Sequence, residues 1–177
     1  MAQITRLNHA VLYVSDLDRS VDFYTKAFGM EEIAREGGMM AFLRARGSDN
    51  HHDLGLFQVG ATAKRPGRGA IGLYHLAWQV ASIDELAEAA SSLAELGALT
   101  GASDHGATKS LYGSDPDGIE FEVMWLVPRD QWGDYERNAI TRRLDLQREL
   151  ERFGAKAQPD GTATDGHLHL DRSPLTT

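Results

Sequence analysis

The stretch LNHAVLYV at residues 7–14 decides the fold of this chain, because the stretch LYHLAWQV at residues 73–80 repeats it. Both copies have a histidine in third place, His9 in the first and His75 in the second. Alternating apolar residues with many β-branched and aromatic types are typical of β-strands. The repeat therefore predicts two similar modules, each opening with a strand that carries a histidine.

Composition narrows the class of protein. The chain has 177 residues, 42% of them hydrophobic, which favours one domain with a single core built from two halves. A net charge of −8 argues against nucleic acid and anionic membrane surfaces as partners. No stretch approaches the roughly 20 apolar residues of a membrane span, and the first residues do not resemble a signal peptide. We therefore expect a soluble, cytoplasmic protein.

Because cysteine is absent, any metal must take histidine and carboxylate ligands.

The first module, residues 1–60, has the pattern of a βαβββ unit. After the opening strand, Asp16 can cap a helix whose apolar positions from Leu17 to Phe28 fall at helical spacing and which ends near Gly29. Three further strands are expected at residues 31–34, 39–44 and 53–59.

The second module, residues 70–127, follows a linker rich in Gly, Pro and basic residues and repeats the same order. Its helix opens with a capping box at Ser82 and closes near Gly97. Its later strands are expected at residues 98–100, 109–113 and 119–127, the last two joined by the tight turn DPDG at 115–118. We expect residues 1–127 to form one domain, followed by a helix within 128–154 and a loose tail over 155–177.

Strand parity predicts which faces carry polar groups, since alternate side chains of a strand point to opposite faces. On the first strand of the first module, His9 shares a face with Val11 and Tyr13. On the first strand of the second module, His75 shares a face with Ala77 and Gln79. On the last strand the apolar face holds Phe121, Val123 and Trp125, and the other holds Glu120, Glu122 and Met124. We expect helices to cover the apolar faces, and the mixed faces to line a cavity.

Several motifs together resemble a known family. They are LNH at 7–9, HHDLGL at 51–56, YHL at 74–76 leading into VAS at 80–82, and SLY at 110–112 running into DPDGIEFE at 115–122. Over residues 4–127 this pattern is similar to the vicinal oxygen chelate superfamily, and within it to the catalytic half of the type I extradiol catechol dioxygenases. The resemblance implies an α+β fold in which two tandem βαβββ modules form an open curved sheet around a metal cavity.

The resemblance also implies a metal site and an activity. In that family the ligands are the histidine of each module's first strand and a glutamate on the last strand, which match His9, His75 and Glu122. Such a site holds Fe(II), or alternatively Mn(II), and leaves three coordination positions for two catechol oxygens and dioxygen. By the same resemblance His52 is the acid/base group and Tyr112 donates a hydrogen bond to the substrate oxygen, and His105 is a further contributor to catalysis.

Other functions stay open at this stage. Glyoxalase I shares the fold, but by the same resemblance its metal site has a fourth protein ligand, which comes from the last strand of the first module. On that strand this chain offers Leu54, Leu56 and Gln58. A metal-free binding protein, like the drug-sequestering members of the fold, would need no metal ligands. The chain lacks the N-terminal module pair of the larger dioxygenases, which favours a homo-oligomer. Its expected small-molecule partners are a catechol and dioxygen.

Overall fold

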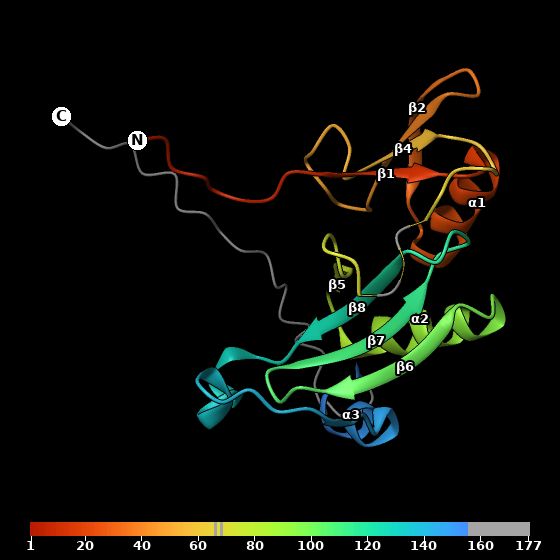
Figure 1. Cartoon of the computed structure of the whole chain (residues 1–177). Helices are drawn as coiled ribbons and strands as arrows, with labels where there is room; N and C mark the ends of the chain where they lie inside the picture. The colour runs from red at the N-terminus through yellow and green to blue at the C-terminus, as the bar shows by residue number, and fades with distance from the viewer. Residues whose placement is uncertain (66, 68, 156–177) are drawn as a thin grey trace.

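The computed structural model describes residues 1–65, 67 and 69–155, and it contains two βαβββ modules, drawn one above the other in Figure 1. The first module forms a four-stranded sheet in the order β1-β4-β3-β2, in which β1 and β4 are parallel. Its elements are β1 (Ala10–Val14), α1 (Leu17–Phe28), β2 (Glu31–Glu36), β3 (Met40–Arg44) and β4 (Leu54–Gln58).

The second module repeats this topology in a five-stranded sheet of order β5-β8-β7-β6-β9, with β5 and β8 parallel. Its elements are β5 (Leu76–Val80), α2 (Ile83–Glu95), β6 (Leu99–Asp104), β7 (Thr108–Ser114) and β8 (Glu120–Leu126), and the edge strand β9 (Arg142–Arg143) comes from the C-terminal segment. The α+β class and the tandem repeat are confirmed. The open sheet is confirmed as well, and each module contributes a sheet of its own.

The capping residues begin and end the helices as the sequence predicts. The Asp16 carboxylate accepts a hydrogen bond from the Arg19 backbone N–H at 3.0 Å, and Gly29 ends α1 in the left-handed region with φ 63°. The Ser82 hydroxyl accepts from the Glu85 N–H at 3.1 Å. Both opening strands are shorter than expected, so that His9 and His75 each lie directly before the first residue of their strand.

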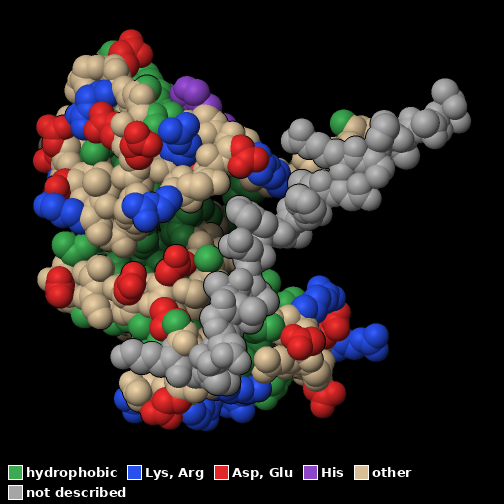
Figure 2. Space-filling model, turned by 180° about the vertical axis from the view of Figure 1, so that it is seen from behind, with side chains coloured by type: hydrophobic (Ala, Val, Ile, Leu, Met, Phe, Trp, Pro, Cys, Tyr) green, Lys and Arg blue, Asp and Glu red, His purple; other side chains and the backbone are tan. Residues whose placement is uncertain are grey.

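One hydrophobic core joins the two modules. Helix α1 packs on the first sheet, and its Phe23 and Phe28 rings also contact Phe121 of β8, with centroids 5.9 and 5.0 Å apart. Phe28 further contacts Trp78 of β5. In Figure 2 hydrophobic side chains gather in the waist between the upper and lower halves. The covered faces of both sheets therefore share a core.

The turn between β7 and β8 ties the modules together through polar groups. Asp117, which is 6% exposed, accepts hydrogen bonds from the backbone N–H and the hydroxyl of Ser15, at 2.7 and 2.5 Å. Arg19 and Arg65 pair with the same carboxylate. The Tyr24 hydroxyl donates to Asp115 at 3.1 Å. Because Asp117, Asp115 and Tyr24 are buried and Ser15 is half-buried, these hydrogen bonds fix how the first module sits on the second.

The segment after β8 differs from the single helix expected within 128–154. It contains two 3₁₀ turns, at Arg129–Gln131 and Gly133–Glu136, then β9 (Arg142–Arg143), and only then α3 (Leu146–Phe153). Gly133 has φ 53°, a backbone conformation that does not continue a helix, and β9 pairs with β6. Of the predicted tail over 155–177, all but residue 155 lies outside the described residues.

A buried charge cluster fastens α3 to the second sheet. Lys109 is 5% exposed and its ammonium lies 2.5 Å from Asp104 and 3.7 Å from Glu149 of α3, both 1% exposed. Each buried charge thus has an opposite charge beside it, which offsets the cost of desolvation.

No helix in the part of the chain that the structure describes is long and apolar enough to cross a membrane.

Candidate metal and substrate site

His75 and Glu122 meet on the open face of the second sheet. Strands β5 and β8 are parallel with Ala77 opposite Glu122, and Ala77 and Gln79 of the same face are exposed, as parity predicts. The His75 Nε2 atom lies 3.1 Å from the Glu122 Oε2 atom. Nδ1 of His75 is buried and has no hydrogen-bond partner among the described residues, so the Glu122 carboxylate is the polar contact that orients this ring. A half-buried carboxylate facing an imidazole suits a divalent cation, which both groups can ligate.

Tyr112 stands beside this pair. It lies opposite Glu122 in the antiparallel ladder of β7 and β8, and its hydroxyl is 3.4 Å from the Glu122 Oε1 atom. The same hydroxyl is 2.8 Å from Nε2 of His105. Burial, followed by the negative charge of Glu122, raises the pKa of Tyr112 above its ordinary value. The phenol is therefore protonated at neutral pH and retains a hydrogen to donate.

His9 and His52 form a second cluster, on the first module. Their ring centroids are 4.4 Å apart, and the His52 ring also packs on Phe42 at 4.8 Å. Two residues that sequence reasoning missed hold this arrangement: the side-chain amides of Asn8 and Asn50 bond each other at 3.0 Å, and Asn50 also donates to the Asn8 carbonyl. Neither asparagine lies in a periodic pattern, so only the fold reveals their pairing.

Asp53 shapes the loop that presents His52. Its carboxylate accepts hydrogen bonds from the Ala45 backbone N–H, the Ser48 hydroxyl and the Asn50 amide. Burial raises the pKa of Asp53, but these three hydrogen bonds outweigh burial and hold the pKa below its ordinary value. The loop therefore carries a fixed negative charge next to His52.

Burial and like charges keep His52 neutral. Partial burial lowers its pKa below the ordinary 6.5, and the neighbouring His9 and His51 lower it further. A neutral imidazole can accept a proton, which is the property required of a general base.

The structure does not assemble the three predicted ligands within one chain. It brings His75 to Glu122 and His9 to His52, but in the described residues no three histidine, aspartate or glutamate side chains converge as a metal-binding group. The reason is the shared core. Phe121 and Trp78 lie on the face of the second sheet that α1 covers, so the open faces of the two sheets lie on the outer sides of that core.

Gly55 occupies the place in the first module that Glu122 occupies in the second. In the parallel pair β1/β4, Gly55 lies opposite Val11, just as Glu122 lies opposite Ala77 in β5/β8. A Cβ at Gly55 would meet the Val11 side chain at 3.3 Å. Gln58, the other candidate for a fourth ligand, instead accepts a hydrogen bond from the Leu17 backbone N–H at 2.8 Å. The first module therefore offers the site a histidine but no carboxylate from β4.

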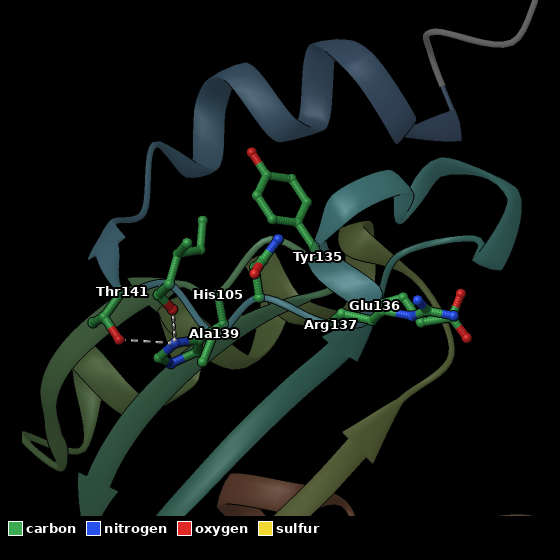
Figure 3. Close-up of a pocket in the computed structure, with 8 residues that line it drawn as sticks. His105, Tyr135, Glu136, Arg137, Ala139 and Thr141 are labelled. Atoms are coloured by element: carbon green, nitrogen blue, oxygen red, sulfur yellow. Dashed lines mark hydrogen bonds between the residues drawn. The ribbon is translucent and has the colours of Figure 1, made fainter.

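His105 takes part in a contact outside the predicted site. Its Nδ1 atom lies 2.9 Å from the backbone carbonyl of Ile140, and the hydroxyl of Thr141 is 3.3 Å from the same nitrogen, as Figure 3 shows. His105 and residues 135–141 line a cavity of about 490 Å³. Sequence reasoning missed this segment because a backbone carbonyl leaves no trace in a motif.

Comparison with known proteins places the chain in a family. A catechol-2,3-dioxygenase of Bacillus subtilis is 33% identical over 178 residues, covering 97% of this chain and 61% of that protein. Metapyrocatechase 2 of Cupriavidus necator is 32% identical over 73% of this chain and 34% of its own length. A lactoylglutathione lyase of rice is also 32% identical, over 70% of this chain and 44% of that protein. The chain thus spans less than two thirds of each of these relatives.

The fold has close counterparts among solved structures. A glyoxylase/bleomycin resistance protein/dioxygenase domain from Frankia sp. EAN1pec superposes with a TM-score of 0.60 at 26% identity, over 72% of this chain and 96% of that one. The family model for the Glyoxalase/Bleomycin resistance protein/Dioxygenase superfamily matches residues 6–123, which include His9, His75 and Glu122. The chain therefore belongs to the glyoxalase/bleomycin resistance protein/dioxygenase superfamily, the proteins of the vicinal oxygen chelate fold.

Proposed function

We propose that this protein is an extradiol ring-cleaving dioxygenase that acts on a catechol-type aromatic diol. The observation that carries the proposal is the pairing of His75 with Glu122 beside Tyr112, on the face of the second sheet opposite the core residues Phe121 and Trp78. The relative named catechol-2,3-dioxygenase supports the reaction class. Its name does not identify the ring substituents of a substrate of this chain.

The proposed metal ligands are His9, His75 and Glu122, and the proposed ion is Fe(II), with Mn(II) as the alternative. Two neutral imidazoles and one carboxylate match the ligand set of non-haem Fe(II) oxygenases that leave coordination positions open. When bound, the ion offers the diol oxygens and dioxygen one shared set of positions, which removes the entropic cost of bringing them together.

His52 is the proposed acid/base group. Its lowered pKa keeps the imidazole neutral at pH 7, so that it can accept a proton from a catechol hydroxyl. The adjacent Phe42 ring gives an aromatic substrate an apolar surface next to this base. In this proposal Tyr112 is the hydrogen-bond partner of a substrate oxygen.

A second copy of the chain completes the proposed site. His9 and Glu122 lie on opposite outer sides of one core, so a two-fold dimer can place the His9 face of each copy against the Glu122 face of the other. Two apolar side chains of β1 on the His9 face, Val11 and Tyr13, are 50% and 73% exposed, which suits an interface. The symmetry then produces two identical sites.

Gly55 separates this proposal from a glyoxalase reaction. A lyase of the glyoxalase I type is expected to have four protein ligands at its metal. In this chain the position of the first module that is equivalent to Glu122 is Gly55, which has no side chain. A site with three ligands keeps the extra position that dioxygen requires.

Oxygen uptake tests the function. The purified full-length chain is reconstituted with Fe(II) without air and given simple and bicyclic catechols, and we expect dioxygen consumption together with a new visible absorbance from the opened ring. Glu122→Gln should abolish both, whereas Glu120→Gln, which changes a carboxylate two residues away on the same face, should preserve them. Formation of lactoylglutathione with Ni(II) or Zn(II), without oxygen uptake, would overturn the proposal.

A further inference from the structure

The segment of residues 128–145, here named the C-terminal strap, reaches back to the second sheet next to the proposed site. It contains both 3₁₀ turns and β9, and it passes His105 on the side away from Tyr112. Figure 3 shows His105 between the strap residues Ala139 and Thr141. His105 therefore connects the strap to Tyr112.

A neutral imidazole carries one hydrogen, and the strap determines where it sits. The carbonyl oxygen of Ile140, 2.9 Å from Nδ1 of His105, can only accept a hydrogen bond. Nδ1 must therefore carry the hydrogen, and Nε2 is left as an acceptor. The Thr141 hydroxyl, at 3.3 Å, is the more distant of the two contacts with Nδ1.

The tautomer of His105 in turn fixes the direction of the Tyr112 hydroxyl hydrogen. That hydroxyl has one hydrogen and two acceptors within reach, Nε2 of His105 at 2.8 Å and the Glu122 Oε1 atom at 3.4 Å, whereas the neighbouring Ser110 hydroxyl acts as a donor to it. Because Nε2 is a bare acceptor at the shorter distance, the hydrogen goes to His105. The longer donation from Tyr112 to Glu122, at 3.4 Å, is then given up for the shorter one to His105, and a lone pair of the Tyr112 oxygen is available to the substrate space.

We propose that the C-terminal strap is a positioning element of the active site: the Ile140 carbonyl holds His105 in its Nδ1–H tautomer, and His105 in turn makes Tyr112 an acceptor toward the substrate. This deepens the proposed function and replaces the donor role that the family resemblance implies for Tyr112. In this arrangement Tyr112 accepts a hydrogen bond from the catechol hydroxyl that does not give its proton to His52, and so helps to select the orientation of the diol.

The strap is fastened on both sides of Ile140. Before it, the Tyr135 ring lies over Gly106, where an added Cβ would come within 2.4 Å of the ring. After it, Arg142 pairs with the buried Asp104 at 3.2 Å and also contacts the Tyr135 hydroxyl at 3.2 Å. The carbonyl is thus held in place by contacts that do not involve the proposed ligands.

The tautomer can be measured without metal or substrate. The full-length chain labelled with ¹⁵N-histidine is examined by NMR above pH 8, where imidazoles are neutral, and the His105 signals are assigned by their loss in His105→Gln. We expect the Nδ1–H form to dominate. A dominant Nε2–H form would overturn the proposal, whether or not the protein cleaves catechols.

Two matched pairs of variants test the role of the strap. Arg142→Ala releases the contacts with Asp104 and Tyr135 and should shift His105 toward the Nε2–H form, whereas Arg143→Ala, the same change of charge one residue later, should not. Thr141→Val should leave the tautomer unchanged, because the carbonyl and not the hydroxyl sets it. An unchanged tautomer in Arg142→Ala, or a changed one in Thr141→Val, would refute the assignment.

Kinetics then separate a positioning role from a structural one. His105→Gln offers Tyr112 an amide oxygen as acceptor, and His105→Leu offers none. If the dioxygenase activity is present, we expect Gln to retain a larger share of kcat than Leu while both variants keep the wild-type Tm within a few degrees. Equal losses in the two variants would argue against the acceptor role. Absence of activity in the wild type would refute the proposed function but leave the tautomer result standing.

Discussion

Gly55 and Glu122 hold equivalent positions in the two modules, Gly55 opposite Val11 and Glu122 opposite Ala77. The two modules thus share the same strand pairing, and only the second has a carboxylate at this position. In the proposed metal site this loss keeps a coordination position free.

Restoring that carboxylate should close the site. In Gly55→Glu we expect the bound metal to be retained and dioxygen uptake to fall by at least ~10²-fold, because the fourth ligand takes the position of a reactant. Gly55→Ala is the control, since its Cβ meets Val11 at 3.3 Å and adds no ligand. Metal analysis and an oxygen electrode measure both properties. Full activity in Gly55→Glu would show that β4 does not face the metal.

Complementation tests the two-chain site. His9→Ala and Glu122→Ala should each be inactive alone, but a mixture allowed to exchange subunits should recover about a quarter of wild-type activity, because half of the dimers are mixed and each holds one intact site. Sites contained within single chains would show no recovery. Sedimentation before and after mixing confirms that both variants dimerise.

The pH profile reports on His52. Burial and the neighbouring His9 and His51 lower its pKa, so the neutral, proton-accepting form persists below pH 6.5. We expect the acid limb of kcat/KM to lie below 6.5 and to disappear in His52→Gln, with kcat reduced by ~10²–10⁴. His51→Gln is the control, because His51 is exposed and its removal should change kcat little.

Asp117 should make stability sensitive to acid. Burial raises its pKa, but the hydrogen bonds from Ser15 and the charges of Arg19 and Arg65 outweigh burial, so the folded pKa lies below the ordinary 3.8. A carboxyl with a lowered folded pKa contributes stability above pH 3.8 and loses it as the pH falls through the folded value. We expect Asp117→Asn to lower the free energy of unfolding by about 1–3 kcal/mol at pH 7 and by less at pH 3. Urea unfolding at the two pH values measures the difference, and equal losses would argue against this role.

Two strand glycines provide a matched test of packing. At Gly113 of β7 an added Cβ would come within 2.3 Å of the Phe121 ring and 2.6 Å of the Ala98 carbonyl, whereas at Gly101 of β6 it would meet nothing within 4 Å. Gly113→Ala should therefore destabilise the fold by about 1–3 kcal/mol and Gly101→Ala should not. Thermal unfolding compares them, and equal Tm values would show that the Phe121 ring moves aside at no cost.

Local patterns in the sequence determined the modules. The strands that follow His9 and His75, the caps at Asp16 and Ser82, and the alternation in β8 were predictable because each depends on residues within a few positions of one another. The C-terminal segment was predicted less well. Its helical composition is overridden by Gly133 and by the pairing of β9 with β6, which is a contact between distant residues.

Repeat and motif alone established which residues are candidates: the ligand types at His9, His75 and Glu122 and the base at His52. Tertiary structure decided which of them meet. Phe23 and Phe28 pack against Phe121 across the two modules, and in the described residues His75 meets Glu122 and His9 meets His52 without the two pairs converging as one metal-binding group. The reason is physical: alternation along a strand states which side chains share a face, but the relative placement of two sheets depends on packing between residues about 100 positions apart, which no local pattern records.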